Sequence, residues 1–136
     1  MQVTREQLIQ FVQNNFYVLS HLSKLYAPLE GRNWTKWRIE RYNKFTVEMI
    51  FGQERHLRLT YSRYLLMYAM AKNGYTHRYI GSLFNYSNSA ANVGKHLVIR
   101  YLNRYASSEE ILLINELVAD FKKEFNIVKK YSRSEA

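Results

Sequence analysis

The chain has 136 residues, of which 47% are hydrophobic and 23% charged, and this favours one folded domain over a disordered segment or two separate cores. One proline and five glycines are too few turn residues for an all-β sandwich, and the lack of cysteine excludes disulfides, thiolate metal sites and cysteine catalysis. The N-terminal residues lack a signal pattern, and no run reaches about 18 apolar residues. We therefore expect a soluble, cytoplasmic protein without a membrane partner.

The formal net charge is +9, and it is distributed unevenly along the chain. Residues 55–108 contain no aspartate or glutamate. The basic residues of this acid-free stretch are Arg55, Arg58, Arg63, Lys72, Arg78, Lys95, Arg100 and Arg104. Cations without local carboxylate partners attract a polyanion, and nucleic acid is the commonest one. Basic residues that merely coat a soluble surface are the alternative.

The N-terminal part is predicted to form two long helices. Thr4 begins a capping box, and apolar residues spaced three or four apart then continue one helix to Tyr26. A second helical pattern runs over residues 33–51. Trp34 and Trp37 lie near its start, where tryptophan is typical of a core anchor, with a partner-binding patch as the alternative.

The acid-free stretch is predicted to form three further helices with tight turns between them, over residues 59–73, 76–84 and about 89–105. Gly81 lies inside the short middle helix, where glycine costs about 1 kcal/mol relative to alanine, so we expect a neighbouring segment to need the space. Three helices in this order are typical of a helix-turn-helix, with three ordinary core helices as the alternative. The turns and caps are assigned to Gly74, Thr76, Asn85 and one of Ser87, Asn88 and Ser89.

The last helix is predicted to begin at a capping box formed by Ser107 and Glu110. Its apolar residues have the spacing of a packed helix pair, at Ile111, Ile114, Val118, Phe121, Phe125 and Val128. We expect it to dock on its own domain, with a homodimer or a protein partner through this helix as the alternative. The chain is predicted to be a single all-α domain of about six helices: N-terminal helices over 1–53, a helix-turn-helix over 54–106, a final helix over 107–130 and a frayed tail over 131–136.

Two segments of the acid-free stretch carry a family resemblance. Residues 62–71 read Ser-Arg-Tyr-Leu-Leu-Met-Tyr-Ala-Met-Ala, and residues 80–84 read Ile-Gly-Ser-Leu-Phe. They are similar to the ARQIAMYLA helix and the following Ile-Gly helix in the C-terminal DNA-binding domain of DnaA-type bacterial replication initiators. The resemblance covers about residues 54–105 and implies a Trp-repressor-like helix-turn-helix. Serine or asparagine replaces the family's Arg-Asp-His motif, so the resemblance does not imply that this chain binds the family's DNA target sequence. The sequence also lacks a Gly-x-x-x-x-Gly-Lys phosphate-binding loop, so an ATPase domain is not predicted.

The register of the third helix is predicted from its apolar stripe. Val93 and Leu97 are spaced to face inward, which leaves polar residues on the opposite face. There Asn92 is suited to the N6/N7 edge of adenine. The resemblance places Arg55 and Arg58 in a basic loop that contacts phosphate or the minor groove. The predicted DNA-binding residues are Arg55, Arg58, Arg63, Ser87, Asn88, Ser89, Asn92, Lys95, His96 and Arg100.

The sequence does not predict an enzyme. Its four histidines lack the spacing of a metal site, and the centre of the chain offers no pair of carboxyl groups for acid–base catalysis. No metal, cofactor or small-molecule substrate is predicted. We predict a small protein that binds double-stranded DNA as a transcription regulator or replication accessory of a bacterium or mobile element. The alternatives are a protein-interaction module with the same fold and an RNA-binding protein.

Overall fold

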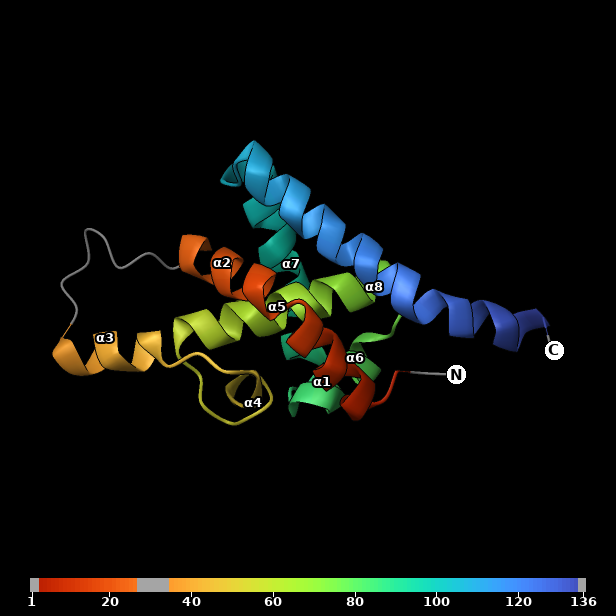
Figure 1. The fold of residues 1–136 in the computed structure, drawn as a ribbon, viewed down its shortest axis with the longest axis horizontal. Coiled ribbons are helices and arrows are strands. Elements are labelled where there is room, and N and C mark those ends of the chain that lie inside the picture. Colours follow the sequence, from red (N-terminus) through yellow and green to blue (C-terminus); the bar gives the residue numbers. More distant parts are fainter. Residues whose placement is uncertain (1–2, 27–34, 135–136) are drawn as a thin grey trace.

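The computed structural model describes residues 3–26 and 35–134, with side chains described for 3–24 and 35–125. This part of the chain is all-helical, with eight helices and no strand (Figure 1). The helices are α1 (Arg5–Asn14), α2 (Phe16–Tyr26), α3 (Lys36–Asn43), α4 (Val47–Ile50), α5 (Leu57–Lys72), α6 (His77–Phe84), α7 (Asn88–Arg104) and α8 (Ser108–Ser134). The predicted all-α class is confirmed. None of the described helices is both long and apolar enough to cross a membrane.

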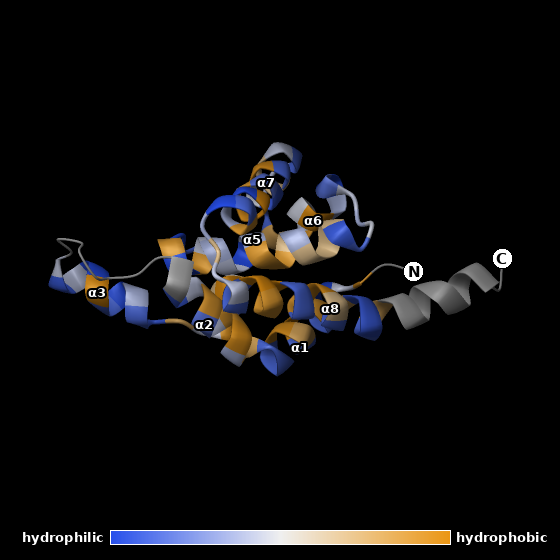
Figure 2. Ribbon diagram, turned by 90° about the horizontal axis from the view of Figure 1, so that it is seen from above, coloured by the Kyte–Doolittle hydropathy of each residue, from blue (hydrophilic) through white to orange (hydrophobic). Residues whose placement is uncertain are grey.

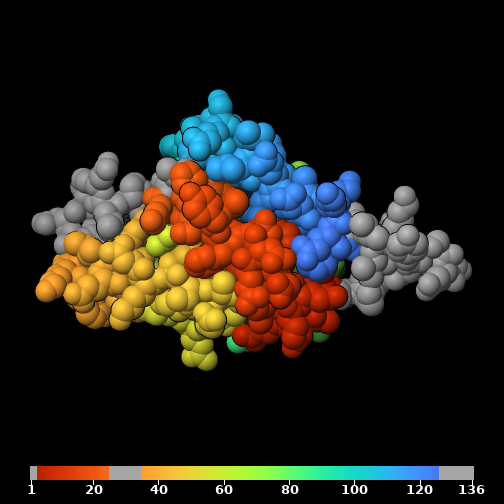
Figure 3. Space-filling model, in the orientation of Figure 1, coloured from red at the N-terminus to blue at the C-terminus, as the bar shows by residue number. Residues whose placement is uncertain are grey.

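Helix α5 is the centre of the fold. Its buried residues point in every direction around the helix, from Leu59 to Met70, because other helices pack on all its sides. Helices α6 and α7 pack against it from one side, and α2 and α8 from the other (Figure 2). In Figure 3, α1, α2 and α8, together with the segment of α3 and α4, cover one face of the molecule and leave little of α5 in view. The acid-free stretch therefore supplies both the core helix and an outer layer.

The predicted caps are confirmed. Thr4 and Gln7 form a reciprocal capping box, with Gln7 N donating to Thr4 Oγ1 at 3.2 Å and Thr4 N donating to Gln7 Oε1 at 2.9 Å. Ser107 and Glu110 form a second box. Side-chain oxygens of Thr76 and Ser87 cap α6 and α7, and Gly74 (φ 90°) and Asn85 (φ 56°) have the left-handed conformation. Each of these features is decided within a few residues of chain.

The predicted N-terminal helices are each divided in two. The first ends at Asn15, whose side-chain Nδ2 donates to the carbonyl oxygen of Phe11 at 2.9 Å and so ends α1. The second is interrupted at residues 44–46, where Thr46 caps the short α4. Trp37 is 62% exposed, so it is not the core anchor that its position suggested. Trp34 lies outside the described residues.

Helix α8 docks along its own domain, as predicted. Phe121 lies against Phe11 of α1, with ring centroids 5.1 Å apart, and against Tyr75. Ile114 and Phe125 of the predicted seam are also buried, Val118 is partly buried, and Val128 lies outside the described side chains. The buried face is rotated relative to the prediction: Leu117 joins it and Ile111 is partly exposed. The helix continues to Ser134, past the expected end near residue 130.

Candidate nucleic-acid interface

Helices α6 and α7 pack closely across a tight turn, and Gly81 makes that approach possible. A Cβ atom at position 81 would lie less than 3.0 Å from the carbonyl oxygen of Tyr86 and 3.1 Å from that of Ser87. Asn85, in the left-handed conformation, reverses the chain between the two helices, and its N–H and that of Tyr86 both bond to the Gly81 carbonyl oxygen. The predicted need for space at position 81 is confirmed.

The predicted register of α7 is wrong. Val93, expected in the core, is 52% exposed, whereas Ala91, Gly94 and Val98 are buried. The cause is Gly94, which lies against the ring of Tyr64 on α5: a Cβ atom there would be 2.5 Å from Tyr64 Cδ1. The helices therefore approach most closely at small residues and not at the larger apolar side chains of α7.

The face of α7 that is opposite Gly94 carries mostly polar side chains. At 100° per residue, the side facing away from Gly94 includes Ser89, Asn92, Val93, His96 and Arg100. All five are exposed except Asn92, which is partly buried. Of the other predicted contacts on this helix, Asn88 is exposed and Lys95 partly buried. Ser87 is exposed as well, but its hydroxyl accepts the N–H of Ala90 as the N-cap.

Arg55 lies beside the turn that joins α6 to α7. Its side chain is exposed, and its guanidinium carbon lies 4.3 Å from the centroid of the Tyr86 ring. Tyr86 belongs to the turn between α6 and α7, so the cation–π contact holds a positive charge next to the start of α7. The structure thus brings Arg55 and the predicted α7 residues to one region.

Arg58 does not belong to this region, contrary to the prediction. It is 3% exposed, and its guanidinium donates to Ser23 Oγ at 3.0 Å, to Ser20 Oγ at 2.6 Å and to the Tyr42 carbonyl oxygen at 3.4 Å. The ring of Phe45 covers it at 4.2 Å. Burial lowers the pKa of this guanidinium, and the neighbouring Tyr42 opposes the shift. Arg58 links α5 to α2 and to the end of α3, so it is not available to phosphate.

Arg63 is likewise a core residue and not a DNA contact. It is 1% exposed, and its guanidinium donates to four main-chain carbonyl oxygens, those of Ile50 (2.6 Å), Met49 (2.8 Å), Gly52 (3.3 Å) and Glu54 (2.6 Å). These carbonyls include those of Met49 and Ile50 at the end of α4, where the last carbonyls of a helix lack intrahelical donors. The Met49 oxygen also accepts the N–H of Gly52 at 3.1 Å. The prediction failed because a charge pattern does not distinguish a cation on the surface from one that binds main-chain oxygens.

Within the described part of the chain, the cations of α6 and α7 form no ion pair with a carboxylate. Among the described residues, the ion pairs join Arg41 to Glu54 and His21 to Glu109 (3.7 Å), and none involves a cation of α6 or α7. The pKa of His77 is lowered by desolvation and by the positive charges of Lys95 and His96. Lys95 and His96 of α7 therefore lie near His77 of α6.

The structure offers no metal centre in the residues it describes, where no three histidine, aspartate or glutamate side chains gather as ligands. Comparison of the chain with family models, with curated proteins and with solved structures finds no significant match. The resemblance to the DnaA domain therefore stays a prediction from sequence. Sequence reasoning missed two residues of this region, Val93 on the outer face and Gly94 beneath it. An interior glycine in a long helix was the available signal for Gly94.

Proposed function

We propose that the protein binds double-stranded DNA through α7, as a transcription regulator or replication accessory. The observation that carries this proposal is the outer face of α7. Its N-terminal half carries hydrogen-bonding side chains beside Arg55, among cations that form no ion pair with any carboxylate of the described residues. An α-helix fits the major groove of B-DNA, and in a helix-turn-helix the N-terminal residues of the second helix meet the base edges.

The side chains on this face suggest a division of roles. The Asn92 amide has the donor and acceptor pair that matches the N6/N7 edge of adenine, and the exposed Val93 is suited to the methyl group of thymine. Ser89 and His96 flank these two residues on the same face. Arg55 and Arg100 lie outside this centre and would neutralise phosphates, which fixes the position of α7 without reading sequence.

Arg55 and Arg100, which are both exposed, should contribute to the salt dependence of binding. We expect Arg55→Ala and Arg100→Ala each to weaken binding to selected and random duplexes alike, and to reduce the slope of log K against log salt by about 1, because each removes one phosphate contact. Fluorescence anisotropy with a labelled duplex at several salt concentrations measures this. Lys24→Ala, an exposed cation on α2, is the matched control and should leave the slope unchanged. Slopes that are equal in all variants would contradict the proposed surface.

Asn92 should carry sequence preference. We expect Asn92→Ala to relax preference at one base position by about 1.5 kcal/mol, because a bidentate amide–adenine contact discriminates by about 1–3 kcal/mol. Selection of bound duplexes from a random pool, followed by affinities for single-base variants, measures the effect. Asn103→Ala replaces the same residue type in the last turn of α7, where the helix has left the groove, and should keep the preference. Loss of preference in both variants, or in neither, would refute the assignment.

A protein-interaction module is the second candidate, favoured by apolar side chains at the corner between α7 and α8. Tyr105 and Leu112 are exposed there, and Ile111 is partly so. The same titration separates the candidates when it is run with duplex DNA, RNA and random-sequence DNA. A steep salt dependence with duplex preference supports DNA binding. A preference for RNA supports the RNA-binding alternative. Absence of binding to every polymer at low salt supports the interaction module.

A further inference from the structure

The corner where α7 meets α8 exposes apolar side chains. Tyr105 is 68% exposed, Leu112 58% and Ile111 36%. In Figure 1 this corner projects from one edge of the molecule, and in Figure 3 the start of α8 lies uncovered at that edge. Large apolar side chains that gather on a surface indicate an interaction site, whereas single ones do not. The α7–α8 corner therefore has the character of a protein-binding surface.

The charge of the chain changes sign at this corner. Residues 55–108 contain no aspartate or glutamate, and residues 105–121 contain no lysine or arginine. Arg104 in the last turn of α7 and Glu116 further along α8 are both exposed, and the three apolar residues lie between them in the chain. The corner thus has a positive arm on α7 and a negative arm on α8, with an apolar centre.

The charges of the two arms are not used within one copy. Glu109 at the start of α8 lies 3.7 Å from His21 of α2, measured between Oε1 and Nε2. Within the described residues, however, neither Arg104 nor Glu116 forms an ion pair. Their opposite charges, which do not meet inside one copy, are available to a partner.

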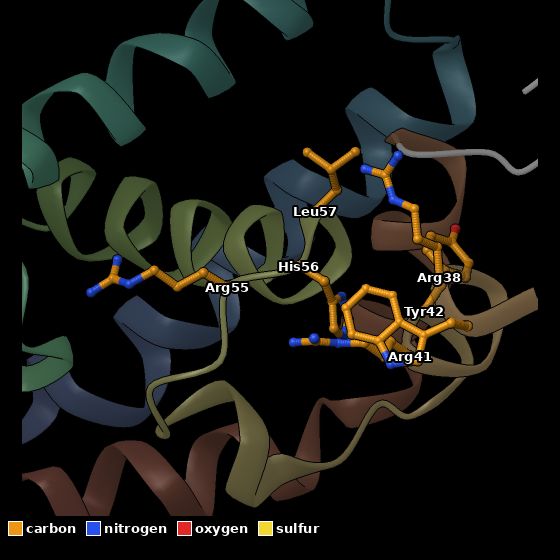
Figure 4. Close-up of a pocket in the computed structure, with 7 residues that line it drawn as sticks. Arg38, Arg41, Tyr42, Arg55, His56 and Leu57 are labelled. Carbon is orange, nitrogen blue, oxygen red and sulfur yellow. The ribbon is translucent and has the colours of Figure 1, made fainter. Parts of the chain in front are cut away.

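A second group of exposed apolar side chains lacks this property. Trp37 and Leu57 line a cavity between α3 and the start of α5 (Figure 4). Arg41 at its wall is paired with Glu54 and lies over the Trp37 ring, so its charge is already engaged. None of the residues that line the cavity is acidic. The α7–α8 corner offers charges of both signs, and the cavity does not.

We propose that two copies of this chain associate through the α7–α8 corner, around a two-fold axis that brings Arg104 of each copy to Glu116 of the other. A surface with a positive and a negative arm is complementary to itself, because a two-fold rotation exchanges the arms. Tyr105, Ile111 and Leu112 of both copies pack at the centre. Another protein would need the same charges in reversed order, whereas a second copy supplies them. Because three apolar side chains a copy make a small interface, we expect a dissociation constant in the micromolar range.

Sedimentation equilibrium with the full chain tests this proposal. We expect a monomer–dimer equilibrium that weakens as salt is added and that stops at the dimer, because a two-fold contact is closed. Arg104→Glu and Glu116→Arg should each weaken association about tenfold, because each brings like charges together twice in the dimer. An equimolar mixture of these two variants should associate as the parent does, because every contact between unlike chains again joins opposite charges.

The apolar centre is tested with Tyr105→Ala and Leu112→Ala, which should both weaken association. Tyr17→Ala is the matched control: Tyr17 is an 86% exposed tyrosine of α2, away from the corner, and its loss should leave association unchanged. The substituted side chains are all exposed, so the variants should keep the circular dichroism spectrum and the unfolding midpoint of the parent.

Several results would overturn the proposal. A parent chain that stays monomeric at about 100 µM is one. Oligomers that grow beyond the dimer are another, as is a mixture of the two charge variants that stays monomeric. An effect of Tyr17→Ala as large as that of Tyr105→Ala also counts against the corner.

The dimer also predicts how DNA is bound, an expectation that rests on the proposed function. Two α7 helices related by a two-fold axis contact half-sites in inverted repeat. A duplex with two inverted copies of the selected sequence should therefore bind more tightly than a duplex with one copy. Glu116→Arg should abolish this advantage, although it adds a positive charge. A chain that dimerises but binds no duplex refutes the proposed function and leaves the dimer standing, and a monomeric chain that binds duplex refutes the dimer alone.

Discussion

Arg63→Met is expected to lower the free energy of unfolding by about 3 kcal/mol, a large effect for a residue type that is usually on the surface. Methionine keeps an apolar stem of similar length and removes the guanidinium. That group donates to the carbonyl oxygens of residues 49, 50, 52 and 54. A buried carbonyl without a donor costs about 1–3 kcal/mol, and partial movement of the segment toward water limits the sum. Urea unfolding followed by circular dichroism measures the change.

The same substitution should weaken DNA binding, because Arg63 holds the segment that carries Arg55. Its Nη1 also lies 3.3 Å from the hydroxyl of Tyr86, the ring over which Arg55 lies. Arg63 is thus a positioning residue, and Arg63→Met should reduce the salt slope as Arg55→Ala does, under conditions where the variant is folded. Arg78→Met, at an exposed position of α6, is the control for stability and should stay within about 0.5 kcal/mol of the parent. A stability equal to that control would show that the hydrogen bonds of Arg63 contribute nothing.

The sequence predicts the features that short-range chemistry decides. A threonine or serine that caps a helix bonds to an N–H three residues ahead, so Thr76 and Ser87 could be assigned from their neighbours alone. Gly74 and Asn85 are residue types that accept the left-handed conformation, and each follows the last helical turn of its segment. The end of α5, both ends of α6 and the start of α7 follow from these residues. This is why the three-helix order was predicted to within a residue or two.

The features that the sequence does not predict depend on contacts between distant segments. Arg63 meets carbonyls 9 to 14 residues before it, and Arg58 meets Ser20 and Ser23, 38 and 35 residues away. Nothing in the spacing of apolar residues indicates these bonds. The register of α7 depends in the same way on Tyr64, which lies on α5 opposite Gly94. An apolar stripe locates a buried face only when large side chains fill it, and here small ones do.

Burial of two arginines also changes the electrostatic interpretation of the acid-free stretch. Arg58 and Arg63 bind hydroxyl and carbonyl oxygens inside the fold, so their charges stabilise the domain and lie behind other side chains. The field at the surface comes from the other six, of which Lys95 is partly buried and the rest are exposed: Arg55, Lys72, Arg78, Arg100 and Arg104. The expected number of phosphate contacts is accordingly smaller than the charge count of the stretch suggests, and the measured salt slope should be correspondingly modest.

Gly81→Ala is expected to lower the free energy of unfolding by about 2 kcal/mol, although alanine is the better helix former by about 1 kcal/mol. The new methyl group would meet the main-chain oxygens of Tyr86 and Ser87, which belong to the turn and cannot rotate away as a side chain would. Either the turn opens or α7 moves outward from α6. The steric cost, about 3 kcal/mol, therefore exceeds the gain in helix propensity.

Movement of α7 should weaken DNA binding, an effect that loss of stability alone would not produce in a folded variant. The α6–α7 turn sets the direction in which α7 leaves the domain, so Gly81→Ala should weaken duplex binding even at temperatures where the variant is fully folded. Gly52→Ala is the matched control: a Cβ atom there lies 3.4 Å from the nearest oxygen, an ordinary contact, and both stability and binding should be nearly unchanged. Unfolding curves and anisotropy titrations on the same samples separate the two effects. If Gly81→Ala is as stable as Gly52→Ala, glycine at position 81 is not required for the close approach of the two helices. If Gly81→Ala is less stable but binds duplex normally, the direction of α7 does not determine DNA binding.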